Sequence, residues 1–323
     1  MKAWVYTKYG PPEVLQLKEI DKPIPKDNEV LVKVFTTTVN RTDNATIRAI
    51  PFFARVVTGL FRPKKQIPGT EFAGEVEAIG TNVSSLKPGD RVFGFNDLGS
   101  KAHAEYLAIP ESSLVEIPDD ISFEQAAAGT EGAHYAINFI NKVKLEPGHK
   151  VLVNGATGAI GSAAVQLLKH YGAQVTAVCA GENRELVQSL GASRVIDYLT
   201  EDFTRENERY DYVFDAVGKS SFFKCKRILK PGGVYISSDL GYLAQNIFLP
   251  LVTPILKPLL GNRRTVFPVP VDLRKSLELV RDLRLQGKFR AVIDRSYPLE
   301  EIMQAYHYVA TGQKKGNVVI SVV

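Results

Sequence analysis

One segment constrains the fold more than any other part of this 323-residue chain. Residues 151–154 have the pattern of a buried strand and lead through a turn of small residues into an amphipathic helix at 162–171. A strand, tight turn and helix in this order present backbone N–H groups and the positive helix end to a phosphate. Gly158 lets the backbone approach a pyrophosphate, and Gly161 allows close packing of helix and strand. The segment therefore predicts a dinucleotide-binding βα unit.

From residue 150 onward the chain alternates short apolar strands with amphipathic helices. The expected strands are 151–154, 174–179, 195–196, 212–216 and 234–237, and the expected helices between them include 162–171 and 184–190. Strands that alternate with helices form parallel βαβ units. We therefore expect an α/β fold with a doubly wound parallel sheet in this half of the chain.

The first part of the chain has a different pattern, with β-rich runs separated by Gly and Pro. The expected strands there are 3–6, 14–19, 29–37, 71–79, 91–95 and 104–109. We interpret residues 1 to about 110 as an all-β module with one or two inserted helices. Helical patterns follow from Ser122 to about Lys142, and again at 273–286 and 299–311. The expected last strand, 317–322, either joins the first module or lies beside the second sheet.

Charge and cysteine content exclude several classes of protein. The formal net charge of +5 is too small and too dispersed for a nucleic-acid-binding surface, and the basic residues at 62–65 read as a solvated loop. Two cysteines, Cys179 and Cys225, cannot form a disulfide framework or a four-cysteine zinc lobe. Because the N-terminus lacks an apolar signal core, we expect a reducing, cytoplasmic location.

Two apolar stretches call for a membrane test. The stretch at 49–61 is too short to span a bilayer, and that at 240–260 contains prolines at positions 250, 254 and 258, which would break a spanning helix. We expect no membrane span. Both stretches read instead as apolar surface beside a cleft or a partner interface.

The end of the second strand of the nucleotide-binding unit bears on the choice of cofactor. A site selective for NAD places a carboxylate there, on the adenosine ribose, whereas this chain has Ala180. The missing acid leaves room for a 2′-phosphate, with Asn183, Arg184 and Tyr198 as its partners. Glu182 opposes this interpretation unless it points to solvent. NADPH is therefore favoured, and NADH stays open.

Several separated motifs now fit one family. The segments 2–6, 39–43, 69–76, 87–92 and 214–218, together with the glycine-rich turn, resemble the medium-chain dehydrogenase/reductase superfamily. The closer resemblance is to its zinc-independent quinone oxidoreductase branch, the zeta-crystallin-like proteins, and it extends over essentially the whole chain.

The resemblance implies a domain organisation. It predicts a discontinuous GroES-like β domain at 1–123 and 262–323, a Rossmann domain at 124–261, and an active-site cleft between them. It also implies a homodimer.

The resemblance also bears on metal binding. The positions that hold the catalytic zinc in zinc-dependent relatives are occupied here by Asn40, Thr70 and about Glu131. Asn and Thr are poor zinc ligands, and one carboxylate cannot hold the ion, so we expect no zinc. The alternative is a zinc-dependent alcohol dehydrogenase that recruits Glu71 and Glu131 with His134.

The expected activity follows from that ligand set. Without a Lewis acid, the acceptors of choice are those already activated by conjugation. The resemblance therefore implies hydride transfer from the nicotinamide to a small hydrophobic quinone or α,β-unsaturated carbonyl compound. A second alternative is a non-catalytic, NADPH-binding interaction protein that uses the apolar surface at 240–260.

Five residues are candidates for the reaction centre. Asn40 resembles the family asparagine near the nicotinamide and the substrate, although it also suits a turn. Asp43 either orients its loop, bonds a ribose, or caps a helix. His134 or Tyr135 could protonate the product enolate, and Glu131 could anchor the cofactor. The competing interpretation is that Glu131 favours a helix N-terminus and His134 is simply packed.

The remaining candidates form the expected cofactor wall. Those outside the glycine-rich turn resemble the family's cofactor wall, and each lies beside an expected strand end, where doubly wound sheets bind ligands. The candidates are Ala156, Thr157, Gly158, Ala159, Ile160, Gly161, Val217, Gly218, Ser238 and Asn317.

Overall fold

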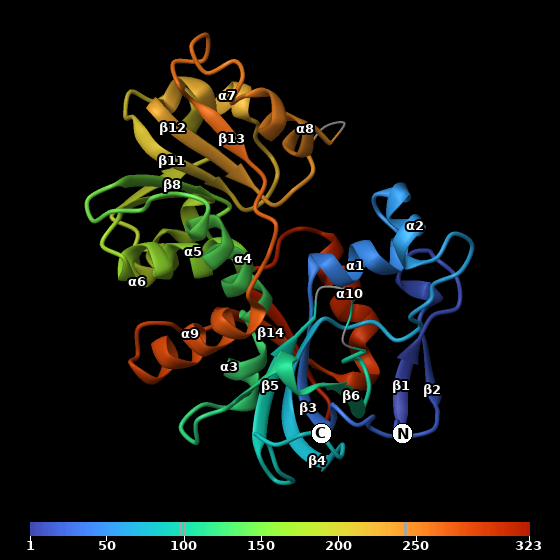
Figure 1. Cartoon of the computed structure of the whole chain (residues 1–323). Coiled ribbons are helices and arrows are strands. Elements are labelled where there is room, and N and C mark those ends of the chain that lie inside the picture. Colours follow the sequence, from blue (N-terminus) through green and yellow to red (C-terminus); the bar gives the residue numbers. More distant parts are fainter. Residues whose placement is uncertain (97–98, 100, 242–243) are drawn as a thin grey trace. The chain divides into compact units, whose positions relative to one another are not determined.

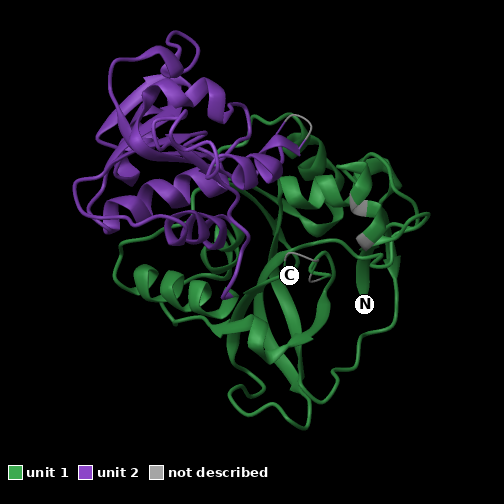
Figure 2. Cartoon of the chain, turned by 45° about the horizontal axis from the view of Figure 1, so that its top comes forward, with its two compact units in different colours: residues 1–131, 273–323 green, residues 132–272 purple. Residues whose placement is uncertain are grey.

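The chain forms two structural units, and the first is built from both ends of the sequence (Figure 2). The computed structural model describes residues 1–96, 99, 101–241 and 244–323 (Figure 1). Unit 1 comprises residues 1–131 and 273–323, and unit 2 comprises residues 132–272. The domain ends expected from the sequence, 123 and 261, fall eight and eleven residues before the unit ends at 131 and 272.

Helix α3, Phe123–Ala127, explains the later end of the first part of unit 1. Its Ala126 and Ala127 are buried in one core cluster with Phe93 and Leu277, all of unit 1. The ring of Phe123 also stacks on Phe35, with centroids 4.6 Å apart. The helix is therefore part of the β unit rather than the start of the nucleotide-binding unit.

Two sheets, one antiparallel and one mainly antiparallel, form the frame of unit 1. The small sheet pairs β1 (Lys2–Val5) with β2 (Gln16–Glu19). The main path of the large sheet runs β14 (Ile293–Pro298), β15 (Asn317–Ser321), β3 (Glu29–Val39), β4 (Glu71–Ile79), β5 (Arg91–Phe95) and β7 (Leu114–Glu116), and β6 (Tyr106–Pro110) also pairs with β3. All these pairs are antiparallel except β14 with β15. The last strand thus joins the first module, one of the two expected places.

The α-helices of unit 1 lie between these strands in sequence. Besides α3 they are α1 (Arg41–Arg48), α2 (Arg55–Thr58), α9 (Leu273–Leu285) and α10 (Ile302–Ala310). Short 3₁₀ turns occur at Pro12–Val14, Phe52–Ala54, Glu111–Ser113 and Leu299–Glu301. Helices α1 and α2 are the insertion expected in the β-rich part.

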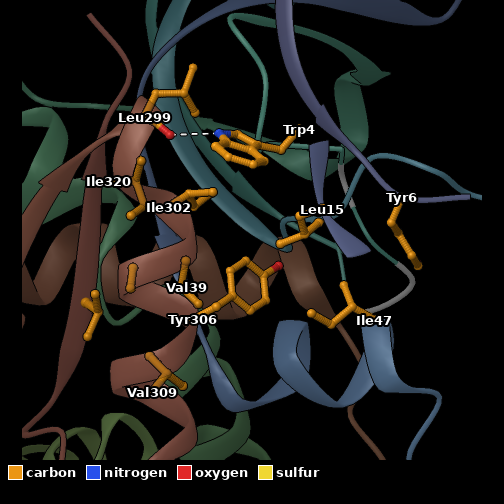
Figure 3. Close-up of a cluster of buried hydrophobic side chains, with 12 residues drawn as sticks. Trp4, Tyr6, Leu15, Val39, Ile47, Leu299, Ile302, Tyr306, Val309 and Ile320 are labelled. Atoms are coloured by element: carbon orange, nitrogen blue, oxygen red, sulfur yellow. Dashed lines mark hydrogen bonds between the residues drawn. The ribbon is translucent and has the colours of Figure 1, made fainter. Parts of the chain in front are cut away.

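A buried cluster joins the two ends of the chain within unit 1 (Figure 3). The Trp4 indole N–H donates to the backbone oxygen of Leu299 at 2.7 Å. Around it pack Val39 of β3, Ile320 of β15 and Tyr306 of α10, all fully buried. Burial of side chains this large contributes about 1.5–3 kcal/mol each, so the chain ends are integral to this core.

A six-stranded parallel sheet forms the frame of unit 2. Its order is β10 (Arg194–Asp197), β9 (Gln174–Cys179), β8 (Lys150–Asn154), β11 (Tyr210–Asp215), β12 (Leu229–Ser237) and β13 (Arg264–Val266). Numbered within the unit this order is 3-2-1-4-5-6, that of the doubly wound dinucleotide-binding fold. The expected strands are confirmed, and β13 adds an edge strand that the sequence pattern did not reveal.

The helices of unit 2 connect the strands of this sheet. They are α5 (Ala159–His170), α6 (Arg184–Leu190), α7 (Phe222–Cys225) and α8 (Gln245–Val252), with 3₁₀ turns at Gly181–Asn183, Phe203–Arg205 and Lys226–Ile228. Helix α4 (Thr130–Asn141) begins with the last two residues of unit 1. The expected apolar stretch at 240–260 includes residues 242–243, which lie outside the described residues. No helix within the described ranges is long and apolar enough to cross a membrane.

Candidate functional site

The glycine-rich turn joins β8 to α5, and each of its three positions has glycine for a different structural reason. Gly155 has a φ of +77°, which an L side chain rarely adopts. A Cβ on Gly161 would lie 2.1 Å from the Gly155 oxygen, so this glycine is required by the chain itself. Gly158 has a φ of −71°, and a Cβ there would meet only one atom, at 3.6 Å. Nothing in the described part of the chain requires glycine at 158, which leaves that space for a ligand.

The start of α5 suits an anionic ligand. Gly158 is the N-cap, and no acidic side chain lies in the first turn. Thr157, Ala159 and Ile160 are half-buried around it, whereas Ala156 is fully buried under the turn. The positive end of a twelve-residue helix and its unpaired N–H groups are therefore available to a phosphate.

Helix α4 packs closely on this region through a glycine. A Cβ on Gly132 would lie 2.6 Å from the backbone carbonyl group of Ala159. Only a residue without a side chain allows this approach, so Gly132 positions the first residue of α5. The sequence analysis did not single out Gly132, because its partner lies 27 positions away.

The residues at the tip of β9 bear on the 2′-phosphate site expected there. Ala180 follows the strand directly and is half-buried. Glu182 is exposed, and its Oε1 lies 3.5 Å from the Asn183 side-chain nitrogen, which donates to it. The carboxylate that opposed NADPH in the sequence therefore faces solvent, while Asn183 itself is buried.

A second carboxylate stands near that tip and was missed by the sequence analysis. A Cβ on Gly181 would lie 2.4 Å from the Oδ2 of Asp197, the last residue of β10. Arg184 is exposed and donates to the Val195 oxygen at 3.4 Å, and Tyr198, directly after Asp197, is also exposed. The cation expected to hold a phosphate is therefore accompanied by an acid from the neighbouring strand.

A buried aspartate fixes the loop that follows β11. Asp215 is fully buried, and its Oδ1 accepts from the Asn154 amide at 2.9 Å and from the Gly218 N–H at 3.0 Å. Its Oδ2 accepts from the Tyr235 hydroxyl at 2.7 Å. Val217 packs on the glycine-rich turn, since a Cβ on the first glycine would lie 2.7 Å from its Cβ. Asp215 therefore holds the expected cofactor-wall residues 217–218 in place.

The carboxyl ends of three central strands meet at one edge of the sheet. Asn154 ends β8, Asp215 ends β11 and Ser237 ends β12, with half-buried Ser238 directly after it. In open parallel sheets this edge binds the ligand. The structure thus brings Ser238, Val217 and Gly218 together with the glycine-rich turn within unit 2.

Unit 1 contains a separate buried polar cluster around Glu71, the first residue of β4. Its Oε1 accepts from the Thr38 hydroxyl at 2.7 Å and the Asn40 side-chain nitrogen at 3.0 Å. Its Oε2 accepts from the backbone N–H of Glu131 at 2.6 Å, at the start of α4. Full burial raises the pKa of Glu71, and these hydrogen bonds oppose that rise. The carboxylate thus joins β3, β4 and α4.

These contacts orient the Asn40 amide. Its nitrogen donates to Glu71 and also to the Thr38 hydroxyl at 3.2 Å, so both N–H groups are used. Its Oδ1 is buried without a hydrogen-bond partner among the described residues. Asn40 is therefore an available acceptor and not an available donor.

Asp43 belongs to the start of α1. Its Oδ2 accepts from the Asn40 backbone N–H at 2.8 Å, and the side chain is almost fully buried. Burial raises the pKa of Asp43 to about 7. As the third residue of α1 that bonds back to the N-cap backbone, Asp43 caps the helix start, so these contacts favour the helix-capping role among those expected from the sequence.

Glu131 lies in a small charged network. Its Oε1 accepts from the Thr42 hydroxyl. Lys314 lies close enough to Glu131 and Glu71 for both carboxylates to raise its pKa, while burial, the larger effect, lowers it. The position of Glu131 in the first turn of α4 is also favourable for a negative charge. Lys314 had escaped the sequence analysis, which considered only the residues after it.

His134 and Tyr135 lie in the next turn of α4, within unit 2. His134 is buried, and burial lowers its pKa to about 4, so the imidazole is neutral at pH 7. The Asn138 amide donates to the His134 backbone oxygen at 2.9 Å. Tyr135 is half-buried, with its ring 6.2 Å from that of His134. A neutral imidazole and a phenol can each donate a hydrogen bond, but the phenol is the stronger acid of the two.

Two further buried polar residues of unit 1 complete the description. Asn317 begins β15, donates through its side chain to the Val292 oxygen at 3.0 Å, and has a buried Oδ1 that, in the described part of the chain, finds no partner. His103 lies between the Thr38 oxygen and the Tyr306 hydroxyl, at 2.8 and 3.2 Å. Burial lowers the pKa of His103 to about 4, so it is neutral as well.

Comparison with known proteins fits this architecture. Residues 26–119 match the alcohol dehydrogenase GroES-like domain family, and residues 190–320 match the zinc-binding dehydrogenase family. The 2-methylene-furan-3-one reductase of Solanum lycopersicum and the chloroplastic NADPH-dependent alkenal/one oxidoreductase of Arabidopsis thaliana are each 32% identical, over 99% of this chain and 79% of theirs. The solved quinone oxidoreductase from Coxiella burnetii is 27% identical, with a TM-score of 0.86 over 100% of this chain and 99% of its own.

The chain therefore belongs to the medium-chain dehydrogenase/reductase superfamily. Both expected folds, the GroES-like module and the Rossmann unit, are confirmed. Within the superfamily the chain falls in the zinc-independent quinone oxidoreductase branch.

The name of one matched family raises the question of zinc. At the positions expected for its ligands, Asn40 turns its amide nitrogen toward Glu71, and Thr70 offers only a hydroxyl. Across the described ranges, no three His, Cys, Asp or Glu residues are grouped so that they could hold a metal ion. This donor set does not fit a catalytic zinc, and no step below uses one.

Proposed function

We propose that this chain is an NADPH-dependent oxidoreductase that transfers a hydride to a quinone or an α,β-unsaturated carbonyl compound. The observation that carries the proposal is the open space at Gly158 over the start of α5, which fits a pyrophosphate. The two relatives at 32% identity are named for reactions on enone-type acceptors, and one is named as NADPH-dependent.

The choice of NADPH rests on the tip of β9. Ala180 leaves room where an NAD site has an acid, Glu182 faces solvent, and Arg184 is exposed. We place the 2′-phosphate beside Asn183, Arg184 and Tyr198. The Asp197 carboxylate limits the preference, because it adds repulsion that a phosphate must overcome through Arg184. NADH is therefore expected to be used, less well than NADPH.

The bound cofactor supplies the hydride, and the chain supplies orientation and hydrogen bonds. Asn40 and Asn317 each offer a buried carbonyl oxygen, which suits the amide or hydroxyl donors of a cofactor or substrate. Negative charge develops on the acceptor oxygen as hydride arrives and requires a donor. Tyr135 fits that role better than the neutral His134. Glu131 is held by Thr42 and Lys314, and we assign it to positioning the start of α4.

The test is NADPH oxidation with a panel of quinones and enones, in the presence and absence of EDTA. We expect turnover with at least one acceptor class and no loss with the chelator. Absence of turnover with both classes, in a protein that binds NADPH, would overturn the proposal and favour a binding protein without catalysis. Loss of activity with EDTA and recovery with zinc would favour the alcohol dehydrogenase alternative.

Two further expectations are proposals as well. The apolar side chains of Phe248, Leu251, Ile255 and Leu259 are exposed, and β13 leaves one edge of the unit 2 sheet unpaired in the described residues. A second copy that covers this surface would give the homodimer. Light scattering on the Leu251→Glu variant would show a monomer if this is correct. We also propose a cytoplasmic location, which fractionation of the source cells would test.

A further inference from the structure

A second exposed surface lies in unit 1, at residues 50–65, on the chain between α1 and β4. From residue 44 to residue 70 the sequence has no Asp or Glu, and its basic residues are Arg48, Arg55, Arg62, Lys64 and Lys65. The formal net charge of the whole chain is +5, so the rest of the sequence is neutral on balance. The excess positive charge of the protein is therefore concentrated in this segment.

The same segment exposes large apolar side chains. Its exposed apolar residues are Ile50, Phe52, Phe53, Val56, Leu60 and Phe61. Each is more than half exposed, and Phe61 is 85% exposed. Arg62, Lys64 and Lys65 follow directly and are exposed too. The exposed basic residues agree with the solvated loop expected at 62–65, and together with the apolar side chains before them they form an amphipathic surface.

Contacts on the inner side keep this surface in place. The Tyr9 hydroxyl bonds to the Thr58 hydroxyl at 2.8 Å and donates to the Gly59 oxygen at 2.9 Å. The Arg55 guanidinium lies over the rings of Tyr9 and Phe52, 4.8 and 4.7 Å from their centroids. Gly59 has a φ of +126°, and a Cβ on it would lie 2.0 Å from the Arg62 oxygen. The tight turn thus presents Leu60, Phe61 and Arg62 outward.

The positive charge of residues 50–65 indicates which kind of partner could cover this surface. A second copy in a two-fold contact would bring the same basic, acid-free surface against itself, with repulsion across the contact. An anionic lipid surface satisfies both properties, because apolar side chains enter the acyl boundary while Lys and Arg stay at the headgroups. No described helix could span a bilayer, so such binding would be peripheral. We propose that residues 50–65 dock the protein on an anionic membrane surface.

Docking of this kind goes beyond the proposed reductase activity and does not depend on it. Each basic residue near an anionic surface strengthens binding about fivefold, and three such residues about a hundredfold. A phenylalanine that enters the acyl region contributes tenfold or more. Binding is expected to weaken with added salt.

The test is co-sedimentation of the full chain with vesicles of 70% phosphatidylcholine and 30% phosphatidylserine, and with vesicles of phosphatidylcholine alone. We expect binding to the first only. The variant R62Q/K64Q/K65Q should bind about a hundredfold more weakly, and F53S/F61S should lose at least tenfold. The matched controls are K18Q/K26Q/K87Q for charge and I24S/F223S for apolar surface, all exposed elsewhere on the chain. Both controls should bind like the unchanged protein.

A second measurement does not depend on binding constants. The chain has one tryptophan, Trp4, which is buried. In the Phe61→Trp variant, brominated acyl chains should quench the new tryptophan. Absence of binding to the anionic vesicles, equal loss in the charge control, or no quenching of Trp at position 61 would overturn the proposal. Binding to heparin with none to vesicles would assign the surface to another polyanion and would also overturn it.

Discussion

Two similar substitutions in the β8–α5 turn should have opposite effects: Gly161→Ala should lower stability, whereas Gly158→Ala should lower cofactor affinity. In Gly161→Ala the new methyl group would lie 2.1 Å from the Gly155 oxygen and 2.8 Å from the Ala156 Cα. Both are backbone atoms, so relief requires the turn itself to move. Overpacking of this kind costs about 1–3 kcal/mol. For a unit of the size of residues 132–272, that lowers the melting temperature of unit 2 by roughly 3–12 °C.

In Gly158→Ala the methyl group would make only an ordinary contact with the Gly155 oxygen, at 3.6 Å, and the φ of −71° suits alanine. Alanine is a poorer N-cap than glycine, but it also reduces the entropy of the unfolded chain. These effects are similar and opposite, so the melting temperature without cofactor should change by only about 2 °C or less. The methyl group would occupy the space proposed for the pyrophosphate. We expect NADPH to bind at least tenfold more weakly, about 1.4 kcal/mol.

The assay is thermal unfolding with and without NADPH, together with titration of NADPH by its fluorescence. The reasoning predicts that Gly158→Ala loses affinity without loss of stability and that Gly161→Ala loses stability even without cofactor. Wild-type affinity in Gly158→Ala would show that the phosphates do not use this space. An unchanged melting temperature in Gly161→Ala would show that the turn is not packed as described.

Three further predictions concern single side chains. Burial raises the pKa of Asp43 from 3.8 to about 7, so its contribution to stability is lost as pH rises from about 4 to about 7. Asp43→Asn should remove the part of this loss that falls between pH 5 and pH 8, on the order of 3 kcal/mol, as measured by urea melts at these two pH values; an unchanged difference would contradict the assignment. Asp197→Asn should lower KM for NADPH several-fold and leave KM for NADH within twofold, and equal changes would refute its position near the phosphate. Tyr135→Phe should lower kcat about 10²-fold with little change in the Kd for NADPH, and wild-type kcat would exclude it as the donor.

The strand-turn-helix units of unit 2 could be predicted because their signals are local. The alternation of apolar residues sets each strand, and the glycines of the turn lie within seven positions of one another. The edge strand β13 has only three residues and is stabilised by its pairing with β12, more than 25 positions earlier, so its own sequence carries little signal. Strand β14 was not expected from the sequence either, although it has six residues; its partner β15 lies later in the chain.

The candidate residues at strand ends could be chosen from the sequence, but their chemical states could not. The sequence pattern identifies Asn40 as a candidate. Only the contact with Glu71, 31 positions away, shows that the N–H groups of its side chain are already used. From the sequence, His134 could be a proton donor or a packed residue. Its burial in the fold lowers its pKa and makes the imidazole neutral. Asp215 and Lys314 act through partners brought together only by the fold.

The course of the chain through unit 1 has a consequence for how the protein is made. Strand β15 lies between β14 and β3, and the Trp4 indole bonds to Leu299. During synthesis the ribosome must therefore add residues up to about 321 before the sheet begun at residue 29 has all its strands. Unit 2, whose residues 132–272 are contiguous, has all its strands much earlier. The nucleotide-binding unit is thus able to fold while the unit that precedes it in sequence still waits for its last strand.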